Sequence, residues 1–198
     1  MPVNKRLATI GDADLFVSAK TRTAVPARHP LLRDALAQAS LDPQVRSINY
    51  VPSTQVESET VKLGAIVVIR DNGHYYLDLV PARRPCAASE RARVKAALTG
   101  LGLRPLVLTE TDILREPRFA NSRIVWEYAR VRVPIGVRLQ VLNILVEDGP
   151  MRLGLLLAAI RHPNDPAPAV MALACHNLIE LDLVSMPLGP GTMARARV

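Results

Sequence analysis

The sequence predicts an α/β protein of two domains, in which a mixed β-sheet flanked by helices precedes a small winged helix. Residues 60–69 are rich in β-branched side chains and lead into Asp71-Asn72-Gly73, a strong turn signal, and residues 74–80 form a returning strand. Helical spacing of apolar residues occurs on both sides of this hairpin in the sequence. After Pro134, three helical segments precede two short strands, which is the order of a winged helix.

The segments before the hairpin are predicted as an arm, a helix and a strand. Residues 1–28 are polar and basic without a sustained period, which predicts an irregular basic arm. Apolar residues recur at helical spacing over residues 30–41, and Asp42-Pro43 ends this helix. Residues 44–51 are predicted as a strand.

Three helices and one strand are expected between the hairpin and Pro134. Ser89 is a suitable N-cap for a helix that reaches Leu101, and Gly102 stops it. The apolar residues 104–108 predict a short strand. A short helix over 109–115 begins with Thr109 as its cap and Asp112 three residues later. The last helix is predicted over 122–130. The first folded domain therefore spans residues 29–133.

The second domain is predicted to span residues 134–198. Its helices are expected at 137–146, 151–160 and 167–180, and its strands at 181–184 and 192–198. The third helix of a DNA-reading winged helix presents polar or basic side chains to base edges. Only His176 and Asn177 are polar candidates there, so a protein-interaction role is at least as well supported as DNA reading.

The charge of the chain favours an acidic partner. The 198 residues carry a net charge of +7 and have a pI near 10, which most simply indicates double-stranded DNA. Residues 82–133 hold 11 basic and 5 acidic residues, a net charge of +6, whereas residues 134–198 hold 5 of each. The alternative is an arginine-rich surface without a binding role.

Cysteine usage and hydropathy indicate a cytoplasmic protein. Cys86 and Cys175 lie far apart in the sequence, and neither has metal-ligand spacing around it. No apolar run reaches the length of a transmembrane helix, and no hydrophobic signal core follows the N-terminus. We therefore expect no membrane association.

The hairpin is of the kind that carries the metal site of many DNA-cutting enzymes, but it lacks most of the required side chains. Metal-dependent DNA hydrolysis needs carboxylates that hold Mg²⁺ and often a lysine near the attacking water. Asp78 and Val80 have the i, i+2 relation that places both on one strand face, yet Val80 offers no charge. A lone carboxylate binds Mg²⁺ weakly, and Asp78 is alternatively explained by a pair with an arginine.

Two further acids precede the hairpin. Glu57 and Glu59 lie two residues apart and could replace the missing metal ligands, although such a pair is more often a solvated strand face. We predict no metal site and no cofactor, unless cleavage survives, in which case Mg²⁺ is required.

Basic residues after the hairpin are the candidates for phosphate contact. Arg91 and Lys95 are i, i+4 neighbours on the predicted helix, and the alternative is again a solvated helix face. Two further arginines on the predicted wing could touch phosphate. The predicted DNA-binding residues are Arg83, Arg84, Arg91, Arg93, Lys95, Arg195 and Arg197.

The ordered set of these segments resembles the TnsA-like family, the endonuclease subunit of heteromeric transposases. Four pieces carry the resemblance over residues 29–198: Leu41-Asp42-Pro43-Gln44-Val45, the hairpin from Ala65 to Pro81, the segment Val107-Leu108-Thr109-Glu110-Thr111-Asp112-Ile113 with Pro117 and Asn121, and the C-terminal residues 137–198.

The resemblance implies a restriction-endonuclease-like fold of the PD-(D/E)XK class and Mg²⁺-dependent cleavage of DNA at a transposon end. It also implies a transposase or an ATPase subunit as a partner. The family's functional positions fall near Leu32 and at Ala65, Asp78 and Val80, so three of the four are apolar here.

These observations favour a catalytically degenerate TnsA-like protein that binds DNA or assists transposition. The first alternative is an active Mg²⁺-dependent endonuclease that uses the displaced acids Glu57, Glu59 and Asp78. The second is a protein–protein adaptor, in which the C-terminal domain docks a partner.

Overall fold

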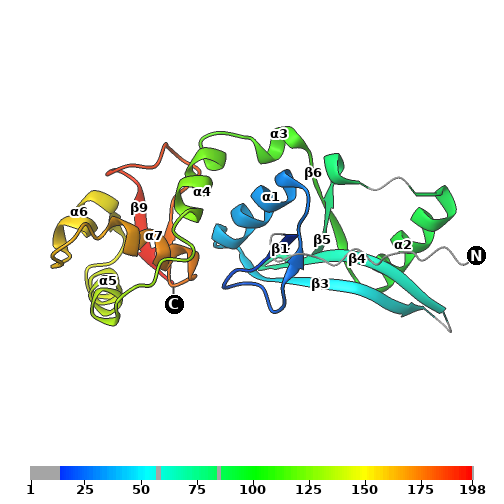
Figure 1. Ribbon diagram of the computed structural model, residues 1–198, viewed down its shortest axis with the longest axis horizontal. Coiled ribbons are helices and arrows are strands. Elements are labelled where there is room, and N and C mark those ends of the chain that lie inside the picture. Colours follow the sequence, from blue (N-terminus) through cyan, green and yellow to red (C-terminus); the bar gives the residue numbers. More distant parts are fainter. Residues whose placement is uncertain (1–13, 57–58, 84–85, 198) are drawn as a thin grey trace, which may run out of the picture.

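A four-stranded mixed sheet forms the larger part of the N-terminal half in the computed structural model, which describes residues 14–56, 59–83 and 86–197 (Figure 1). The strand order is β3-β4-β5-β6, with the first three strands antiparallel and β6 parallel to β5. The strands are β3 (Val45–Val56), β4 (Glu59–Arg70), β5 (Gly73–Leu79) and β6 (Arg104–Leu108). The predicted mixed sheet is therefore confirmed.

Helices cover the two faces of this sheet. Alternate residues of a strand point to opposite faces, and the strands bury apolar side chains on both. Ile66 and Val68 of β4 pack with Leu36 of helix α1 (Pro30–Leu41). Val67, between them in the sequence, packs instead with Leu98 of helix α2 (Ala88–Gly100). α2 lies between β5 and β6 in the chain, so it is the crossover that a parallel strand pair requires.

The described part of the predicted arm differs from the expected irregular structure. Residues 14–28 contain the antiparallel strands β1 (Leu15–Phe16) and β2 (Val25–Pro26). Phe16 is buried, and its ring stacks on that of Trp126 with the centroids 5.1 Å apart. Strands of two residues are too short to produce a hydrophobic period, so the sequence gives no sign of them. Residues 1–13 lie outside the described residues.

A buried lysine holds this segment against the end of α1. The Nζ of Lys20 donates a hydrogen bond to the backbone oxygen of Asp42 at 2.5 Å, and Lys20 is only 4% exposed. Burial, followed by the positive charge of Arg197, lowers the pKa of Lys20 from 10.5 to about 8.

A 3₁₀ turn, η2 (Val80–Ala82), follows β5 and leads to α2. Two short helices then connect β6 to the C-terminal half. Helix α3 (Glu110–Ile113) has the predicted cap, because Thr109 and Asp112 exchange side-chain and backbone hydrogen bonds in a capping box. Helix α4 (Arg118–Trp126) begins and ends four residues earlier than predicted. Its N-cap is Pro117, and proline is well tolerated at a helix start.

The C-terminal half combines three helices with a three-stranded antiparallel sheet, in the strand order β7-β9-β8. Its elements are α5 (Ile135–Glu147), β7 (Met151–Arg152), α6 (Leu153–Ala159), α7 (Ala167–Cys175), β8 (Ile179–Leu181) and β9 (Met193–Ala196).

Helix α7 ends five residues before the predicted position. Asn177 adopts a left-handed backbone conformation, with φ of 61°, and the N–H of Leu178 bonds to the oxygen of Leu173 at 3.0 Å. This is the hydrogen-bond pattern that closes a helix through a left-handed residue, a role that asparagine fills after glycine. The strand that follows consequently begins at Ile179 rather than at the predicted residue 181.

Helix α7 is packed between the two halves of the molecule. Six of its nine residues are buried, from Val170 to Cys175. The core around them includes Val125 from α4, with Trp126 packed at its edge. Figure 1 shows α4 and α7 between α1 on one side and α5 and α6 on the other. Within the described residues, no helix has both the length and the apolar character needed to span a bilayer.

We predict that Lys20 makes the stability of the fold depend on pH. Its pKa in the unfolded chain stays at the ordinary value of 10.5, against about 8 in the folded protein. Between these values the unfolded state binds more protons, so the free energy of unfolding rises with pH, by at most about 1.4 kcal/mol per pH unit. Urea denaturation of the wild type and Lys20→Met between about pH 8 and pH 10 measures this slope.

The substitution Lys20→Met should flatten the slope, because no buried amine remains to lose its proton. Lys62 is exposed on β4, so Lys62→Met is the matched control and should keep the wild-type slope. Equal slopes in both variants would contradict the assignment to Lys20.

Candidate functional site

Asp78 lies near the end of β5 and forms a bidentate ion pair with an arginine. The Nε and Nη2 atoms of Arg83 donate to the two carboxylate oxygens of Asp78 at 2.8 and 2.7 Å. This bidentate pair raises the pKa of Arg83. Burial, and then the negative charge of Asp78, raise the pKa of the nearby Tyr76 phenol. The arrangement matches the alternative in which Asp78 pairs with an arginine.

Of the three apolar positions, only Ala65 lies on the strand beside Asp78, and all three supply apolar side chains where a nuclease site needs polar ones. The β4–β5 pairing runs to Val67 opposite Tyr76, and the same register continued would set Ala65 opposite Asp78. Ala65 packs among apolar residues on the α2 face, while Leu32 packs against Leu79 and Ile113 on the α1 face. Val80 is 38% exposed in η2.

The possible replacement acids lie away from Asp78. Glu59 is the first residue of β4, and its Oε2 atom lies 3.9 Å from Nη1 of Arg93. Six residue steps along β4 separate Glu59 from Ala65, which is about 20 Å of strand. Because Mg²⁺ binds oxygens at about 2.0–2.1 Å, Glu59 and Asp78 cannot hold one ion together. Glu57 lies outside the described residues.

Across the described residues as a whole, no group of three or more His, Cys, Asp or Glu side chains is placed to hold a metal ion. Cys175 is buried in the C-terminal core, where its Sγ donates to the oxygen of Val125 at 3.2 Å. Burial raises the pKa of this thiol to about 12, so it stays protonated and acts as a small apolar side chain.

The predicted phosphate-binding residues of α2 are exposed. Arg91 and Lys95 share one flank of the helix beside the apolar side that packs on the sheet. Arg91 reaches the backbone oxygen of Cys86 at 3.4 Å, and Arg93 lies on the other flank near Glu59. Arg84 lies outside the described residues.

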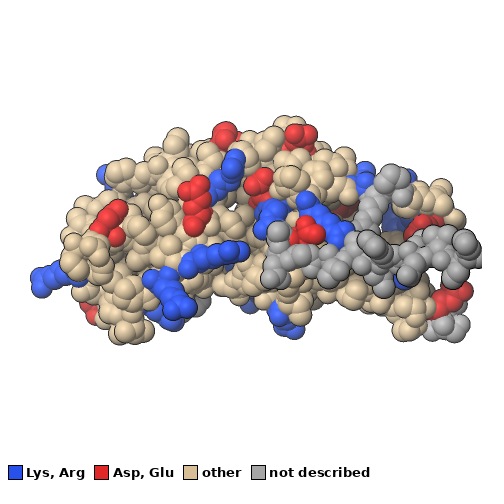
Figure 2. Space-filling view, viewed as in Figure 1, with Lys and Arg blue, Asp and Glu red and all other residues tan. Residues whose placement is uncertain are grey.

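The two predicted wing arginines are paired within the protein. Arg195 on β9 forms an ion pair with Glu180 on β8. Arg197 lies 3.6 Å from Glu180 and donates to the backbone oxygen of Pro43 at 3.0 Å. Figure 2 shows that Lys and Arg side chains are scattered along the visible face, with Asp and Glu side chains among them.

A charged cluster around Asp42 was not predicted from the sequence. The Oδ2 atom of Asp42 lies 3.1 Å from Nη2 of Arg70 on β4 and 3.7 Å from Nη2 of Arg118 on α4. Its Oδ1 atom accepts the backbone N–H of Gln44 at 2.9 Å. Burial lowers the pKa of Arg118. The sequence marked Asp42-Pro43 as a helix stop and as part of the resemblance, but not as a charged cluster, because the ion-pair partners of Asp42 lie far along the chain.

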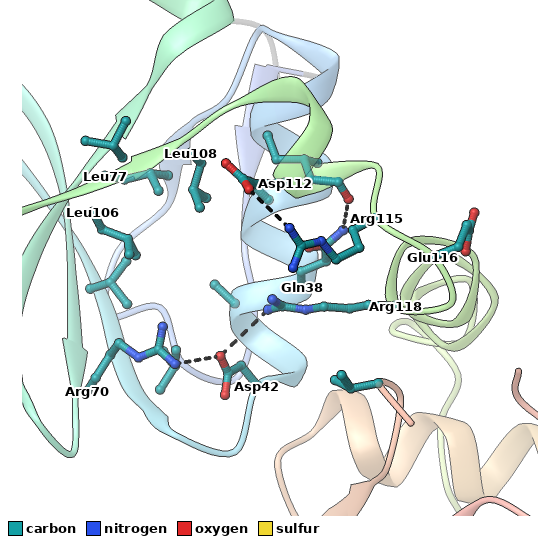
Figure 3. A pocket seen from close by; sticks show the side chains of 17 residues that line it. Gln38, Asp42, Arg70, Leu77, Leu106, Leu108, Asp112, Arg115, Glu116 and Arg118 are labelled. Atoms are coloured by element: carbon teal, nitrogen blue, oxygen red, sulfur yellow. Dashed lines mark hydrogen bonds and ion pairs between the residues drawn. The ribbon is translucent and has the colours of Figure 1, made fainter. Parts of the chain in front are cut away.

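This Asp42 cluster borders a cavity of about 370 Å³ between the sheet, α1, α3 and α4 (Figure 3). One wall is apolar and includes Leu77, Leu106 and Leu108. The other walls carry charged side chains from three elements and their connections, namely Asp42, Arg70, Asp112, Arg115, Glu116 and Arg118. A second cavity, of about 300 Å³, shares Gln38, Asp42, Arg118 and Val184 with the first.

Comparison of the sequence with protein-family models and with curated proteins finds no match.

We predict that Asp42 is required for stability. Its carboxylate is 15% exposed and faces two arginines, so Asp42→Asn leaves their positive charges uncompensated. Loss of these partly buried charge pairs should lower the free energy of unfolding by about 2 kcal/mol, measured by urea denaturation. The control is Asp71→Asn, because Asp71 forms an exposed pair with Arg46 and its loss should change little. Equal effects would show that Asp42 is no more important than a surface acid.

Proposed function

We propose that this chain is a double-stranded DNA-binding protein with a restriction-endonuclease-like core of the TnsA kind, followed by a winged helix, and that it does not cleave DNA. The element order supports the core assignment: one helix, three antiparallel strands, a crossover helix and a strand parallel to the third. The two helices cover opposite faces of the sheet, as the resemblance implies.

The observation that carries the non-cleaving assignment is the pair between Asp78 and Arg83. A catalytic magnesium needs carboxylate oxygens that can face the ion. Both oxygens of Asp78 accept hydrogen bonds from Arg83, and a cation at this place would meet the guanidinium. The positions that the family uses for its other acids and its lysine are occupied by apolar side chains in this protein.

DNA binding through the phosphate backbone is supported by α2. Val94 and Leu98 pack on the sheet, which leaves Arg91 and Lys95 on an exposed flank. Backbone contacts of this kind are electrostatic and independent of base sequence. Arg93, paired with Glu59, contributes less, since part of its charge is already compensated.

The C-terminal half supports a winged helix that does not read bases. The order α5, β7, α6, α7, β8, β9 is that of a winged helix, in which α7 occupies the position of the recognition helix. Here α7 is buried against α4 and α1, so its surface is unavailable to a DNA groove. We infer that this helix joins the two halves of the protein.

A second candidate function is protein–protein adaptation, with a transposase or an ATPase subunit as the partner. It is favoured by an apolar stripe on α5, formed by Ile135, Leu139, Leu142 and Val146. These residues are spaced by four, three and four positions, so they lie on one side of the helix. Three of them are 67%, 53% and 67% exposed, in the order Ile135, Leu139 and Val146. Such a stripe fits an amphipathic helix of another protein.

We predict that the protein binds duplex DNA with a steep salt dependence and leaves it uncut in Mg²⁺. The double variant Arg91→Gln/Lys95→Gln should bind more weakly, and its slope of log K against log salt should be less negative by about 2. Fluorescence anisotropy of a labelled duplex measures binding, and a denaturing gel of the same samples measures cleavage.

The matched control is Arg152→Gln/Arg161→Gln, which removes two exposed charges from the C-terminal half and should leave the slope unchanged. An equal loss of DNA affinity in the two double variants would show that α2 is not part of the binding surface. Strand cleavage that disappears in Asp78→Ala would overturn the non-cleaving assignment.

We predict that Leu139→Glu abolishes capture of a partner protein without altering DNA affinity, because the side chain is exposed and its replacement places a charge in the stripe. A pull-down with a transposase or an ATPase subunit, the partners that the resemblance implies, tests the interaction. Leu101→Glu, at an exposed apolar residue after α2, is the control. Retention of the partner by Leu139→Glu would exclude the stripe as the docking surface.

A further inference from the structure

Among the charged residues around the larger cavity, the carboxylates accept hydrogen bonds within the protein, whereas the guanidinium groups have donors left over. Two of the three carboxylates that line the cavity, those of Asp42 and Asp112, make contacts within the protein. Asp42 accepts from the N–H of Gln44 and faces Arg70 and Arg118. Asp112 accepts from the backbone N–H of Thr109 at 3.0 Å and from its hydroxyl at 2.6 Å. Both of these bonds go to its Oδ2 atom, whereas its Oδ1 atom lies 3.8 Å from Nη2 of Arg115.

Glu116 does not contribute to the interior of the cavity. Its Oε2 atom accepts the backbone N–H of Ala120 at 3.1 Å. Figure 3 shows its side chain pointing away from the cavity, toward α4. The charges that face the interior are consequently two carboxylates and three guanidinium groups.

Each guanidinium group, by contrast, keeps N–H donors that bond to no acceptor among the described residues, although Nη2 of Arg70 bonds to Asp42 and Gln44. Arg115 lies 3.8 Å from Asp112 and Arg118 lies 3.7 Å from Asp42, both beyond hydrogen-bond distance. The buried Nε of Arg70 has no hydrogen-bond partner among the described residues. In Figure 3, Arg115 and Arg118 reach into the same space from the α3–α4 side, while Arg70 approaches from β4. The cavity therefore has spare donors and one uncompensated positive charge.

The wall of the cavity opposite these arginines is apolar. Leu77 of β5 and Leu106 and Leu108 of β6 face the cavity. Val68 of β4 and Ile113 of α3 also line it. A volume of about 370 Å³ falls at the small end of the range for ligand pockets. Neither water nor a bare inorganic anion has an apolar surface that could pack against this wall.

We infer that this cavity binds a small monoanionic carboxylate with an apolar body. The carboxylate oxygens accept from Arg115 and Arg118, as charge-assisted hydrogen bonds to a planar oxyanion require. The apolar body lies against Leu77, Leu106 and Leu108. One negative charge balances the excess of one guanidinium over the two carboxylates. This site is independent of the proposed DNA-binding surface on α2.

The test uses hexanoate as the probe in an NMR titration of the ¹⁵N-labelled protein. Hexanoate should shift backbone amides around the cavity in a saturable way. Hexanamide lacks the charge, acetate lacks the apolar body, and inorganic phosphate is a tetrahedral anion without an apolar body. Each should bind at least about tenfold more weakly, since a charged hydrogen bond or a few buried methylene groups contribute this much.

Two variants locate the binding. Arg118→Gln and Arg115→Gln should each weaken hexanoate binding about tenfold. Arg115 is 73% exposed, so its variant is expected to fold even if Arg118→Gln does not. Arg138→Gln, at an exposed arginine of α5, is the control and should bind as the wild type does. The inference is overturned if hexanoate does not bind, if a comparison compound matches it, or if Arg115→Gln behaves like the control.

Discussion

The carboxylate of Asp42 holds together segments that are far apart in the sequence. It faces Arg70 from the sheet and Arg118 from α4, while its backbone oxygen accepts the buried amine of Lys20. The oxygen of the next residue, Pro43, accepts Arg197 from the C-terminal end. The N-terminal segment, the sheet, α4 and the residue that follows β9 therefore meet at the turn that ends α1. Without one negative charge there, several partly buried cations would oppose each other, so the rest of the arrangement depends on it.

The parts of the fold that could be predicted are those whose signals are local. The hairpin followed from β-branched residues around an Asn-Gly turn, and the cap of α3 followed from Thr109 and Asp112. The two-residue strands β1 and β2 left no period to detect, and α7 ended early because Asn177 adopts a left-handed conformation. The cluster around Asp42 could not be predicted, since its partners lie 28 and 76 residues away in the sequence. Such contacts are set only by the tertiary fold.

The candidate site shows the same division between local pattern and tertiary context. The sequence placed Asp78 on a strand and left open whether it binds metal or an arginine, and the arginine proved to be Arg83, five residues later. In the function that we propose, the acids and the lysine of a nuclease site have given way to Leu32, Ala65 and Val80, two of which pack in apolar clusters. In the same proposal, the fold is retained because its core does not depend on the metal. The positive charge of the protein then binds the DNA backbone, and the buried helix α7 links the two halves.

We propose that Asp78 holds no working metal site, and paramagnetic broadening of NMR signals by Mn²⁺ is the test. Mn²⁺ occupies magnesium sites and broadens NMR signals of nearby amides. We expect weak broadening that is spread over exposed carboxylates, with no preference for residues around Asp78, because Arg83 occupies both of its oxygens. Selective broadening of amides around Asp78 at substoichiometric Mn²⁺, lost in Asp78→Ala, would contradict the account and restore the nuclease interpretation.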